Sequence, residues 1–244
     1  MFEIVSEINL EILSNSSSTK TIPITVTIDD VKGSYLRERT EIRHKRVHDS
    51  PRPGIINGLW ASALGKGGII PIETFMYPAQ NFLDLKLTGM QGDVMKESMN
   101  VAKTLAWELT SEECRKNLLK TFNKTKLQGI HVHCPEGSTP KDGPSAGTAI
   151  TVSIYSRLTN SKVKPYIAVT GEIDLQGQVT AIGGLDIKIL GGIRAGVKEF
   201  IYPSENSREF DRFMERYGEK EKILATTFHP VSNIQEVLQI ALVE

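Results

Sequence analysis

The 244-residue sequence has little of several features that mark specialised classes of protein. Its two cysteines, Cys114 and Cys134, are too few for a disulfide framework and lack the spacing of a zinc site. No apolar run approaches the ~20 residues of a membrane-spanning helix, and the N-terminus lacks the layout of a signal peptide. We therefore expect an intracellular protein, in the cytoplasm or an organelle matrix, that is neither secreted nor bound to a membrane.

An excess of charge of one sign is also missing. Lys plus Arg and Asp plus Glu both number 29, so the net charge gives no general reason to expect nucleic acid or an anionic membrane as a partner. One basic cluster is interspersed with acidic residues, which favours a solvated segment over a nucleic-acid site. The cluster consists of Arg37, Arg39, Arg43, Lys45, Arg46 and Arg52.

The first fifty residues differ from the rest of the chain. Residues 14–21 ("SNSSSTKT") form a polar, low-complexity patch, and residues 22–30 ("IPITVTIDD") predict a strand followed by a helix cap at Asp29. Residues 37–54 are charged and end with two prolines, which predicts a linker. From residue 54 onward strands and helices alternate, and a hydrophobic content of 39% is enough for a sizeable core.

Periodicity predicts the first elements of this larger part. Strands are expected at 69–76 and at 82–89, the second with Leu83, Leu85 and Leu87 on one face. A helix capped by Asp93 follows, and a second helix runs from about Ser111 toward Phe122. The inner stripe of the first helix is predicted at Val94, Ser98, Val101, Leu105 and Leu109.

Residues 129–134 ("GIHVHC") predict a strand on which His131 and His133 share one face. Two histidines at this spacing could chelate a metal ion. No third ligand of suitable type lies nearby in the sequence, so ordinary strand histidines are the favoured interpretation.

A loop rich in Gly and Pro, 135–147 ("PEGSTPKDGPSAG"), joins that strand to a run with helical apolar spacing, which places Ser145 at a helix N-terminus. There, free N–H groups and the helix dipole favour negative charge, including a developing oxyanion. Serine is also a common helix cap, so position alone leaves both roles open. A Gly-x-Ser-x-Gly hydrolase is not favoured, because the match is in letters only and the one late histidine is His229.

Lys188 is a candidate base for Ser145. A strand at 164–173, a turn at 174–177 and a returning strand at 178–182 precede a predicted helix from about Leu185. One face of that helix carries Leu185, Lys188, Gly191, Gly192 and Ala195. A lysine on a closely packed apolar face pays for desolvation when charged, which lowers its pKa toward the range where the amine accepts a proton. The alternative is that Lys188 reaches solvent with only its stem buried.

Several blocks of the sequence resemble the proteolytic domain of Lon proteases, the ATP-dependent serine proteases with a Ser/Lys dyad. They are "GLW", "LTGMQGDVMKES", "PEGSTPKDGPSAG" and "TGEIDLQGQVTAIGGLDIKILGGIRAG", in the family order through most of residues 54–244. The resemblance implies an α+β fold of the ribosomal protein S5 domain 2-like type, with mixed sheets and flanking helices. It also implies a serine endopeptidase that hydrolyses peptide bonds in unfolded or damaged proteins.

The resemblance also implies roles for single residues. Ser145 in "DGPSAG" becomes the nucleophile and Lys188 in "GGLDIKILGG" its general base, 43 residues later as in the family. Thr170 matches a threonine whose hydroxyl helps to orient the lysine amine. Asp142 matches an acidic position near the active site, where it has a secondary role or only braces the loop. No cofactor or metal of this chain is implied, and the expected partners are unfolded polypeptides and further copies of the chain in a hexameric ring.

The sequence departs from the family pattern in two ways. No Gly-x-x-x-x-Gly-Lys-Ser/Thr phosphate loop occurs, so the ATPase module, with its ATP and Mg²⁺, is missing from this chain. Residues 1 to about 45 resemble the end of that module, which predicts a remnant of the ATPase small domain and linker at 1–50 and a Lon-type proteolytic domain at 54–244. We expect an excised fragment, with a natural freestanding protease as the alternative. The second departure is in residues 58–68 ("GLWASALGKGG"). There the tryptophan comes one place earlier than in the family's "GLAWT" and one residue is inserted, which affects the expected geometry of this loop and not the dyad.

A rival interpretation comes from a bacterial recombination protein whose Lon-like domain lacks the dyad and serves as a DNA-associated scaffold. The presence of both Ser145 and Lys188 favours the enzyme, and the balanced charge is unfavourable for a DNA platform. The sequence therefore predicts a peptidase domain that cuts small or unfolded peptides without ATP.

Overall fold

The computed structural model describes residues 5–6, 10, 25–31, 33, 46–135 and 141–243, and the chain divides into two units, Met1–Arg43 and His44–Glu244. In the first unit, α2 spans Ile28–Asp30, and the Asp30 N–H donates to Thr27 Oγ1 over 3.1 Å. Because Asp30 Oδ2 accepts from the Thr27 N–H in return, at 2.9 Å, the two residues form a reciprocal cap. The predicted strand is therefore wrong for residues 25–28, and Thr27 rather than Asp29 caps the helix.

Some sequence predictions lie outside the described residues. These are the polar patch at 14–21 and the predicted linker up to residue 45, with Arg37, Arg39, Arg43 and Lys45. The end of that linker is described: residues 46–51 form neither helix nor strand, and β1, Arg52–Pro53, pairs antiparallel with β6, Lys162–Val163.

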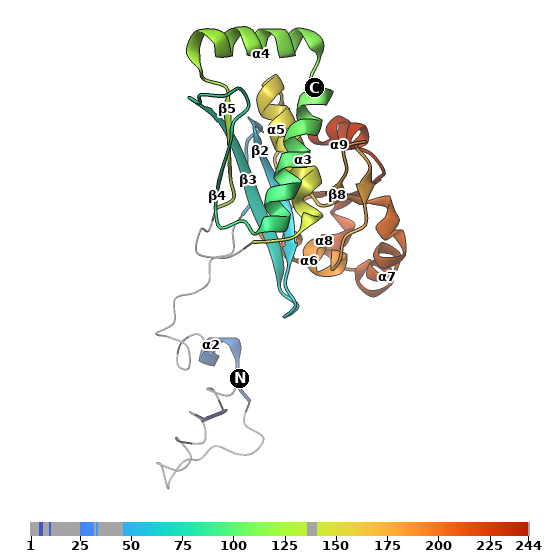
Figure 1. The fold of residues 1–244 in the computed structure, drawn as a ribbon. Helices are drawn as coiled ribbons and strands as arrows, with labels where there is room; N and C mark the ends of the chain where they lie inside the picture. Colours follow the sequence, from blue (N-terminus) through green and yellow to red (C-terminus); the bar gives the residue numbers. More distant parts are fainter. Residues whose placement is uncertain are drawn as a thin grey trace. The chain divides into compact units, whose positions relative to one another are not determined.

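The described part of the second unit contains a mixed seven-stranded sheet in the order β11-β10-β7-β2-β3-β5-β4. Figure 1 labels β2, β3, β4 and β5 of this sheet. The β2–β3 and β3–β5 pairs are antiparallel and the other pairs are parallel. The strands are β2 Ile55–Ala61, β3 Gly67–Tyr77, β4 Leu85–Thr88, β5 Gly129–His133, β7 Ile167–Val169, β10 Glu199–Pro203 and β11 Thr227–Val231. A separate antiparallel pair joins β8, Glu172–Ile173, to β9, Val179–Thr180. Together with the flanking helices, this is the mixed architecture that the sequence predicted.

Helices cover both faces of the sheet. The helices of this unit are α3 Asp93–Leu109, α4 Glu112–Thr125, α5 Gly147–Thr159, α6 Leu185–Ala195, α7 Ser207–Tyr217, α8 Glu221–Leu224 and α9 Ile234–Ala241, with short 3₁₀ turns η2 Pro144–Ala146 and η3 Ser204–Asn206. Along β7, Ile167 and Val169 belong to the apolar cluster that includes α3, α5 and α9, whereas Ala168 belongs to the cluster that includes α6 and α7. Since successive strand residues point to opposite faces, the two clusters lie on opposite sides of the sheet.

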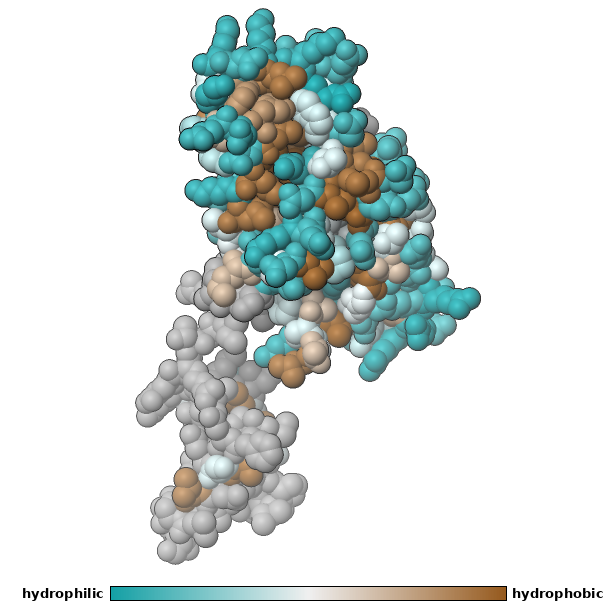
Figure 2. Space-filling model, in the orientation of Figure 1, coloured by the Kyte–Doolittle hydropathy of each residue, from teal (hydrophilic) through white to brown (hydrophobic). Residues whose placement is uncertain are grey.

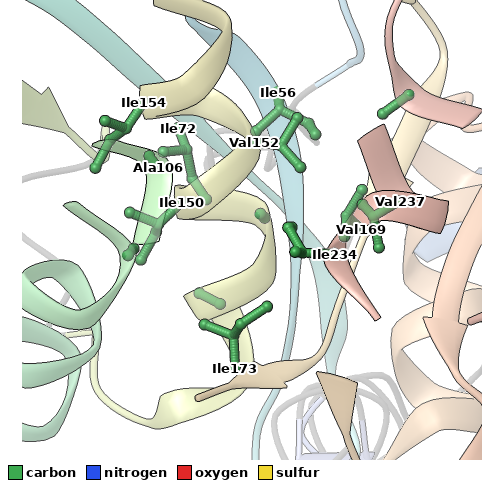
Figure 3. Packing of buried hydrophobic residues seen from close by; sticks show 14 of the residues in the cluster. Ile56, Ile72, Ala106, Ile150, Val152, Ile154, Val169, Ile173, Ile234 and Val237 are labelled. Carbon is green, nitrogen blue, oxygen red and sulfur yellow. The ribbon is translucent and has the colours of Figure 1, made fainter. Parts of the chain in front are cut away.

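Figure 3 shows the first cluster around α5. This helix is buried almost all round, from Gly147 to Ile154, between the sheet and α3. Side chains such as Ile72 and Ile150 are fully buried, and each large aliphatic group buried in this way contributes roughly 1.5–3 kcal/mol to folding. The start of α5, next to Ser145, is therefore fixed by the main core of the unit.

The predicted helix at residue 93 is confirmed, but its cap and inner face are not. Gly92 is the residue before the first turn, and Asp93 lies in that turn with a side chain that is 98% exposed. The inner stripe is rotated by one position from the predicted one, since Val94 is 43% exposed and Leu105 alone of the predicted set is buried. The buried residues of α3 are Met95, Met99, Ala102, Leu105 and Ala106.

The predicted helix near Ser111 is confirmed as α4, with Ser111 Oγ accepting from the Cys114 N–H at 3.3 Å. The strand predicted at 82–89 is shorter than expected. Leu83 has a positive φ of 53°, so β4 begins only at Leu85. The turn of β2 into β3, where the sequence departs from the family, is a hairpin closed by the Ser62 N–H and the Lys66 carbonyl at 2.8 Å.

On the face of the molecule seen in Figure 2, hydrophilic side chains cover most of the described surface, and apolar patches lie between them. In the described part of the chain, no helix combines the length and the apolar character that crossing a membrane requires.

Candidate functional site

Ser145 lies in η2, which leads directly into α5. Pro144 begins this turn, and its fixed φ suits the start of a helix. The predicted position at a helix start is confirmed. The alternative role of the Ser145 hydroxyl as a helix cap is wrong. The N-cap residues of η2 and α5 are Gly143 and Ala146, and neither element has a side-chain cap. The Ser145 carbonyl accepts the Gly171 N–H at 2.9 Å, which ties the turn to the segment after β7.

The loop before Ser145 is fastened to the start of α3. Asp142 Oδ1 accepts the Met95 N–H at 3.0 Å and the Gly143 N–H at 2.9 Å, so Asp142 caps α3 from 47 residues away. Backbone bonds of Lys141 to Met90 and Gly92, at 2.9 and 2.7 Å, hold the same segment. A Cβ atom at Gly92 would lie 2.4 Å from Asp142 Cγ, so only glycine leaves room for this cap.

Lys188 lies on the inner face of α6 and is 3% exposed. The prediction of a buried lysine is confirmed, and the alternative in which its amine reaches solvent is wrong. Burial lowers the pKa of Lys188 to about 8, while the negative charge of Glu209 acts in the opposite direction. A substantial fraction of the amine is therefore neutral in mildly alkaline solution.

Small residues explain how α6 comes so close to the sheet. Gly67, at the start of β3, approaches the backbone of Ile187, and Gly192 lies under the ring of Phe200. A Cβ at Gly192 would meet that ring at 2.6 Å. This close packing of α6 on the sheet accounts for the burial of Lys188, which is 3% exposed.

Thr170 connects Ser145 and Lys188. It follows β7 and is fully buried, and Lys188 Nζ donates to its hydroxyl over 3.3 Å. The Thr170 hydroxyl in turn donates to the Ser145 carbonyl over 3.2 Å. Within residues 46–135 and 141–243, no direct hydrogen bond joins the Ser145 hydroxyl to the Lys188 amine. The structure thus brings Ser145, Thr170 and Lys188 together, with Thr170 between the other two.

Ser145, Lys188 and Asp142 line one cavity of about 520 Å³. Lys141 and Glu172 add charge to its wall. The rest of the wall is largely apolar and includes Leu59, Trp60, Ile69, Ile70, Met95, Pro144, Ala146 and Ile182. A cavity of this size with a few polar groups can enclose a side chain and the backbone of a peptide.

The described histidines lie elsewhere, since none of His48, His131, His133 and His229 lines this cavity. His229, on β11, contacts Glu199 Oε2 at 3.3 Å. His131 and His133 share a strand face as predicted, and both bond to the Thr88 hydroxyl, at 2.9 and 2.7 Å. Among the residues that the structure describes, no three His, Cys, Asp or Glu side chains are grouped so as to hold a metal ion.

A polar clamp of three residues, Glu205, Asn206 and Glu209, holds the segment that leads into α6. Glu205 Oε2 accepts the Ala181 N–H at 2.7 Å, and Glu209 Oε1 accepts the Leu185 N–H at 2.8 Å. Asn206 bonds both the N–H and the carbonyl of Ile182, at 3.0 and 2.8 Å. Sequence spacing does not predict the clamp, because each partner lies 24 residues away.

This arrangement supplies the parts of a nucleophilic site. It holds a hydroxyl at a helix start, an amine with a lowered pKa, and a second hydroxyl that accepts a hydrogen bond from the amine, beside a largely apolar cavity.

Comparison with known proteins identifies the family. The family model described as Lon protease (S16) C-terminal proteolytic domain matches residues 26–244. The Lon protease of Vibrio parahaemolyticus is 38% identical over 219 residues, which cover 90% of this chain and 26% of that protein. The Lon protease of Treponema pallidum is 39% identical over 199 residues, covering 82% and 21%. A Lon protease homolog of Acanthamoeba polyphaga mimivirus is 38% identical over 184 residues, covering 72% and 17%.

The chain spans about a quarter of the length of the first of these relatives and about a fifth of the second. The match covers the whole second unit, including Ser145 and Lys188. The chain belongs to the family of the Lon protease C-terminal proteolytic domain.

Proposed function

We propose that this chain is a serine endopeptidase in which Ser145 is the nucleophile and Lys188 its general base. The observation that carries the proposal is the buried Lys188 amine, held at the Thr170 hydroxyl and lining the same cavity as Ser145. Membership of the Lon proteolytic family supports it. Thr170 orients the amine, and Asp142 braces the loop by capping α3.

In the proposed reaction, the neutral Lys188 amine takes the proton of the Ser145 hydroxyl as Oγ attacks the peptide carbonyl carbon. Backbone N–H groups at the start of α5 stabilise the oxyanion of the tetrahedral intermediate. The C–N bond then breaks, the proton passes from Lys188 to the leaving amine, and an acyl-enzyme remains on Ser145. Water, activated by the same amine, releases the second product. The Lys188 amine turns from Thr170 toward Ser145 in the first step.

We infer that the substrates are unfolded polypeptides or small peptides. The apolar cavity wall suits exposed apolar side chains, which folded proteins bury. The proposed chemistry draws on Ser145 and Lys188 and needs no cofactor bound to this chain. ATP and Mg²⁺ would serve an ATPase module, so cleavage of peptides by this chain is expected to proceed without ATP.

Labelling with a serine-reactive peptide boronate or β-lactone tests the proposal. The parent chain is expected to react, whereas Ser145→Ala and Lys188→Ala are expected to lose the reaction. Equal labelling of all three proteins would overturn it and would favour a non-enzymatic scaffold. A DNA-binding assay on the same samples then distinguishes a DNA-associated scaffold from other roles.

A hexameric ring is a further part of the proposal, because Lon proteases are expected to enclose their sites in such rings. Size-exclusion chromatography with light scattering measures the mass directly. A species of six chains supports the ring, and a monomer at high concentration contradicts it for this chain.

A further inference from the structure

We propose that Glu209 is a positioning residue for Lys188, because it holds the first turn of α6 in place from α7 and keeps a negative charge near the lysine amine. This inference rests on the proposed role of Lys188 as general base. Glu209 is not one of the residues for which the family resemblance implies a role, which are Ser145, Lys188, Thr170 and Asp142.

Helix α6 has no side-chain cap of its own. The residue before the helix is Gly184, which has a positive φ of 69° and no side chain to satisfy the free N–H groups of the first turn. Glu209 supplies the acceptor instead, through Oε1 on the Leu185 N–H at 2.8 Å. Leu185 is three residues, less than one turn, before Lys188, so a shift of this end moves the amine directly.

The Glu209 carboxylate is itself held in place. Its Oε2 accepts from Asn206 Nδ2 at 3.0 Å, and the same Asn206 nitrogen donates to the Ile182 carbonyl. Ile182 lines the cavity with Lys188. The carboxylate therefore belongs to a network that orders both the cavity wall and the start of α6.

The negative charge of Glu209 also acts on the Lys188 amine. The buried amine must lose its proton to act as a base, and the Glu209 carboxylate raises the pKa of Lys188 against the lowering effect of burial. Other charged groups lie on the cavity wall and on the neighbouring elements: Asp142, Lys141 and Glu172 line the cavity, Asp186 is on α6 and Glu205 is on η3. The part of the sheet that packs on α6, β2 with residues 67–72, carries no charged side chain.

Two substitutions of Glu209 distinguish its role in positioning Lys188 from the effect of its charge. Glu209→Gln keeps an oxygen for the Leu185 N–H and removes the charge, so the amine should deprotonate at lower pH and the rise of kcat/KM should move to lower pH. Glu209→Ala removes the cap as well, and the maximal kcat/KM is expected to fall roughly tenfold or more as Lys188 loses its position. Glu205→Gln is the matched control, since it alters another carboxylate of the clamp that bonds Ala181 rather than α6.

The experiment measures two quantities on the folded chain. One is the pH profile of peptide hydrolysis, and the other is the titration of Lys188 by side-chain NMR, with its signal assigned through Lys188→Met. In the NMR titration, we expect Lys188 to have its midpoint at lower pH in Glu209→Gln than in Glu205→Gln. We also expect Glu209→Ala to lose activity.

The inference is overturned if Glu209→Gln titrates like Glu205→Gln, or if Glu209→Ala keeps parental kcat/KM. Because the titration does not depend on catalysis, a parent chain that titrates as expected but shows no Ser145-dependent hydrolysis would overturn the proposed function alone.

Discussion

A Cβ atom on Gly191 would lie 2.2 Å from the carbonyl carbon of Gly67, so helix α6 and strand β3 meet backbone to backbone. Since this contact sets the depth of α6, Gly191→Ala must push the helix away from the sheet. We expect a loss of about 1–3 kcal/mol in the free energy of unfolding, as for other overpacked sites, and a lower kcat/KM. Urea unfolding and peptide hydrolysis measure the two effects.

Gly183→Ala is the control for stability. A Cβ at Gly183 would meet no atom within 4 Å, and this glycine has no positive φ. Its unfolding free energy should stay close to that of the parent. Equal losses of unfolding free energy in Gly191→Ala and Gly183→Ala would show that the Gly191–Gly67 contact does not limit the size of the side chain at position 191.

Asp142→Ala should destabilise the start of α3. It removes the acceptor of the Met95 and Gly143 N–H groups, which typically costs about 1 kcal/mol for a helix cap. Asp142→Asn keeps an oxygen in place and should lose less. Asp93→Ala provides the contrast, because the exposed Asp93 is only paired with Lys96 and should matter by less than roughly 0.5 kcal/mol. Thermal unfolding of the three variants ranks them, and an Asp93→Ala loss as large as that of Asp142→Ala would contradict this account.

Thr170→Val should impair catalysis more than folding. Valine fills the same volume but offers no oxygen to the Lys188 amine, so we expect kcat/KM to fall roughly tenfold or more. Thr170→Ser, which retains the hydroxyl, should keep most of the activity. Steady-state kinetics at several pH values decide the question, and parental activity in the valine variant would exclude the proposed orienting role.

The pH dependence of activity follows from the lowered pKa of Lys188, about 8. A base works when it is unprotonated, so kcat/KM should rise with pH through this value. An activity that instead followed a group titrating near 6.5, the ordinary pKa of histidine, would contradict the assignment of Lys188 as base.

The same pKa links pH to stability. The folded chain binds the Lys188 proton less tightly than the unfolded chain, whose lysine titrates near 10.5, so unfolding free energy should increase with pH between about 8 and 10.5. Below that window the buried charge is fully present and destabilising. Lys188→Met should therefore be more stable than the parent near neutral pH, and its advantage should shrink by roughly 3 kcal/mol across the window.

Denaturant unfolding at the two ends of this window measures the change. Ser145→Ala keeps the lysine and should show the pH dependence of the parent. A constant difference between Lys188→Met and the parent would mean that Lys188 titrates normally in the folded chain.

Local signals in the sequence predicted local structure well. Ser111 caps α4 through a residue three positions away, and the small-residue face of α6 follows from the spacing of Leu185, Lys188 and Gly191. Both features depend on side chains within one or two turns of each other, so a single sequence contains all the information that they need.

Long-range contacts account for the failures. Asp142 replaces Asp93 as the cap of α3 because the loop folds back over 47 residues, which no spacing rule foresees. The predicted inner stripe of α3 lies one position away from the buried one, which includes Met95, Met99 and Ala102. Periodicity does not distinguish two adjacent stripes, and the packing of α5 on α3 decides between them. The bond from Glu209 to Leu185 belongs to the same class.

Ser145 lies in the turn that leads into α5 on one face of the sheet, and Lys188 lies in α6 on the other face. Thr170, just after β7, links them: its hydroxyl donates to the Ser145 carbonyl and accepts from the Lys188 amine. If they act as proposed, a chain in which only one face has packed holds a serine without a base. A newly synthesised chain would then be unable to cleave other proteins or itself until helices have packed on both faces of the sheet.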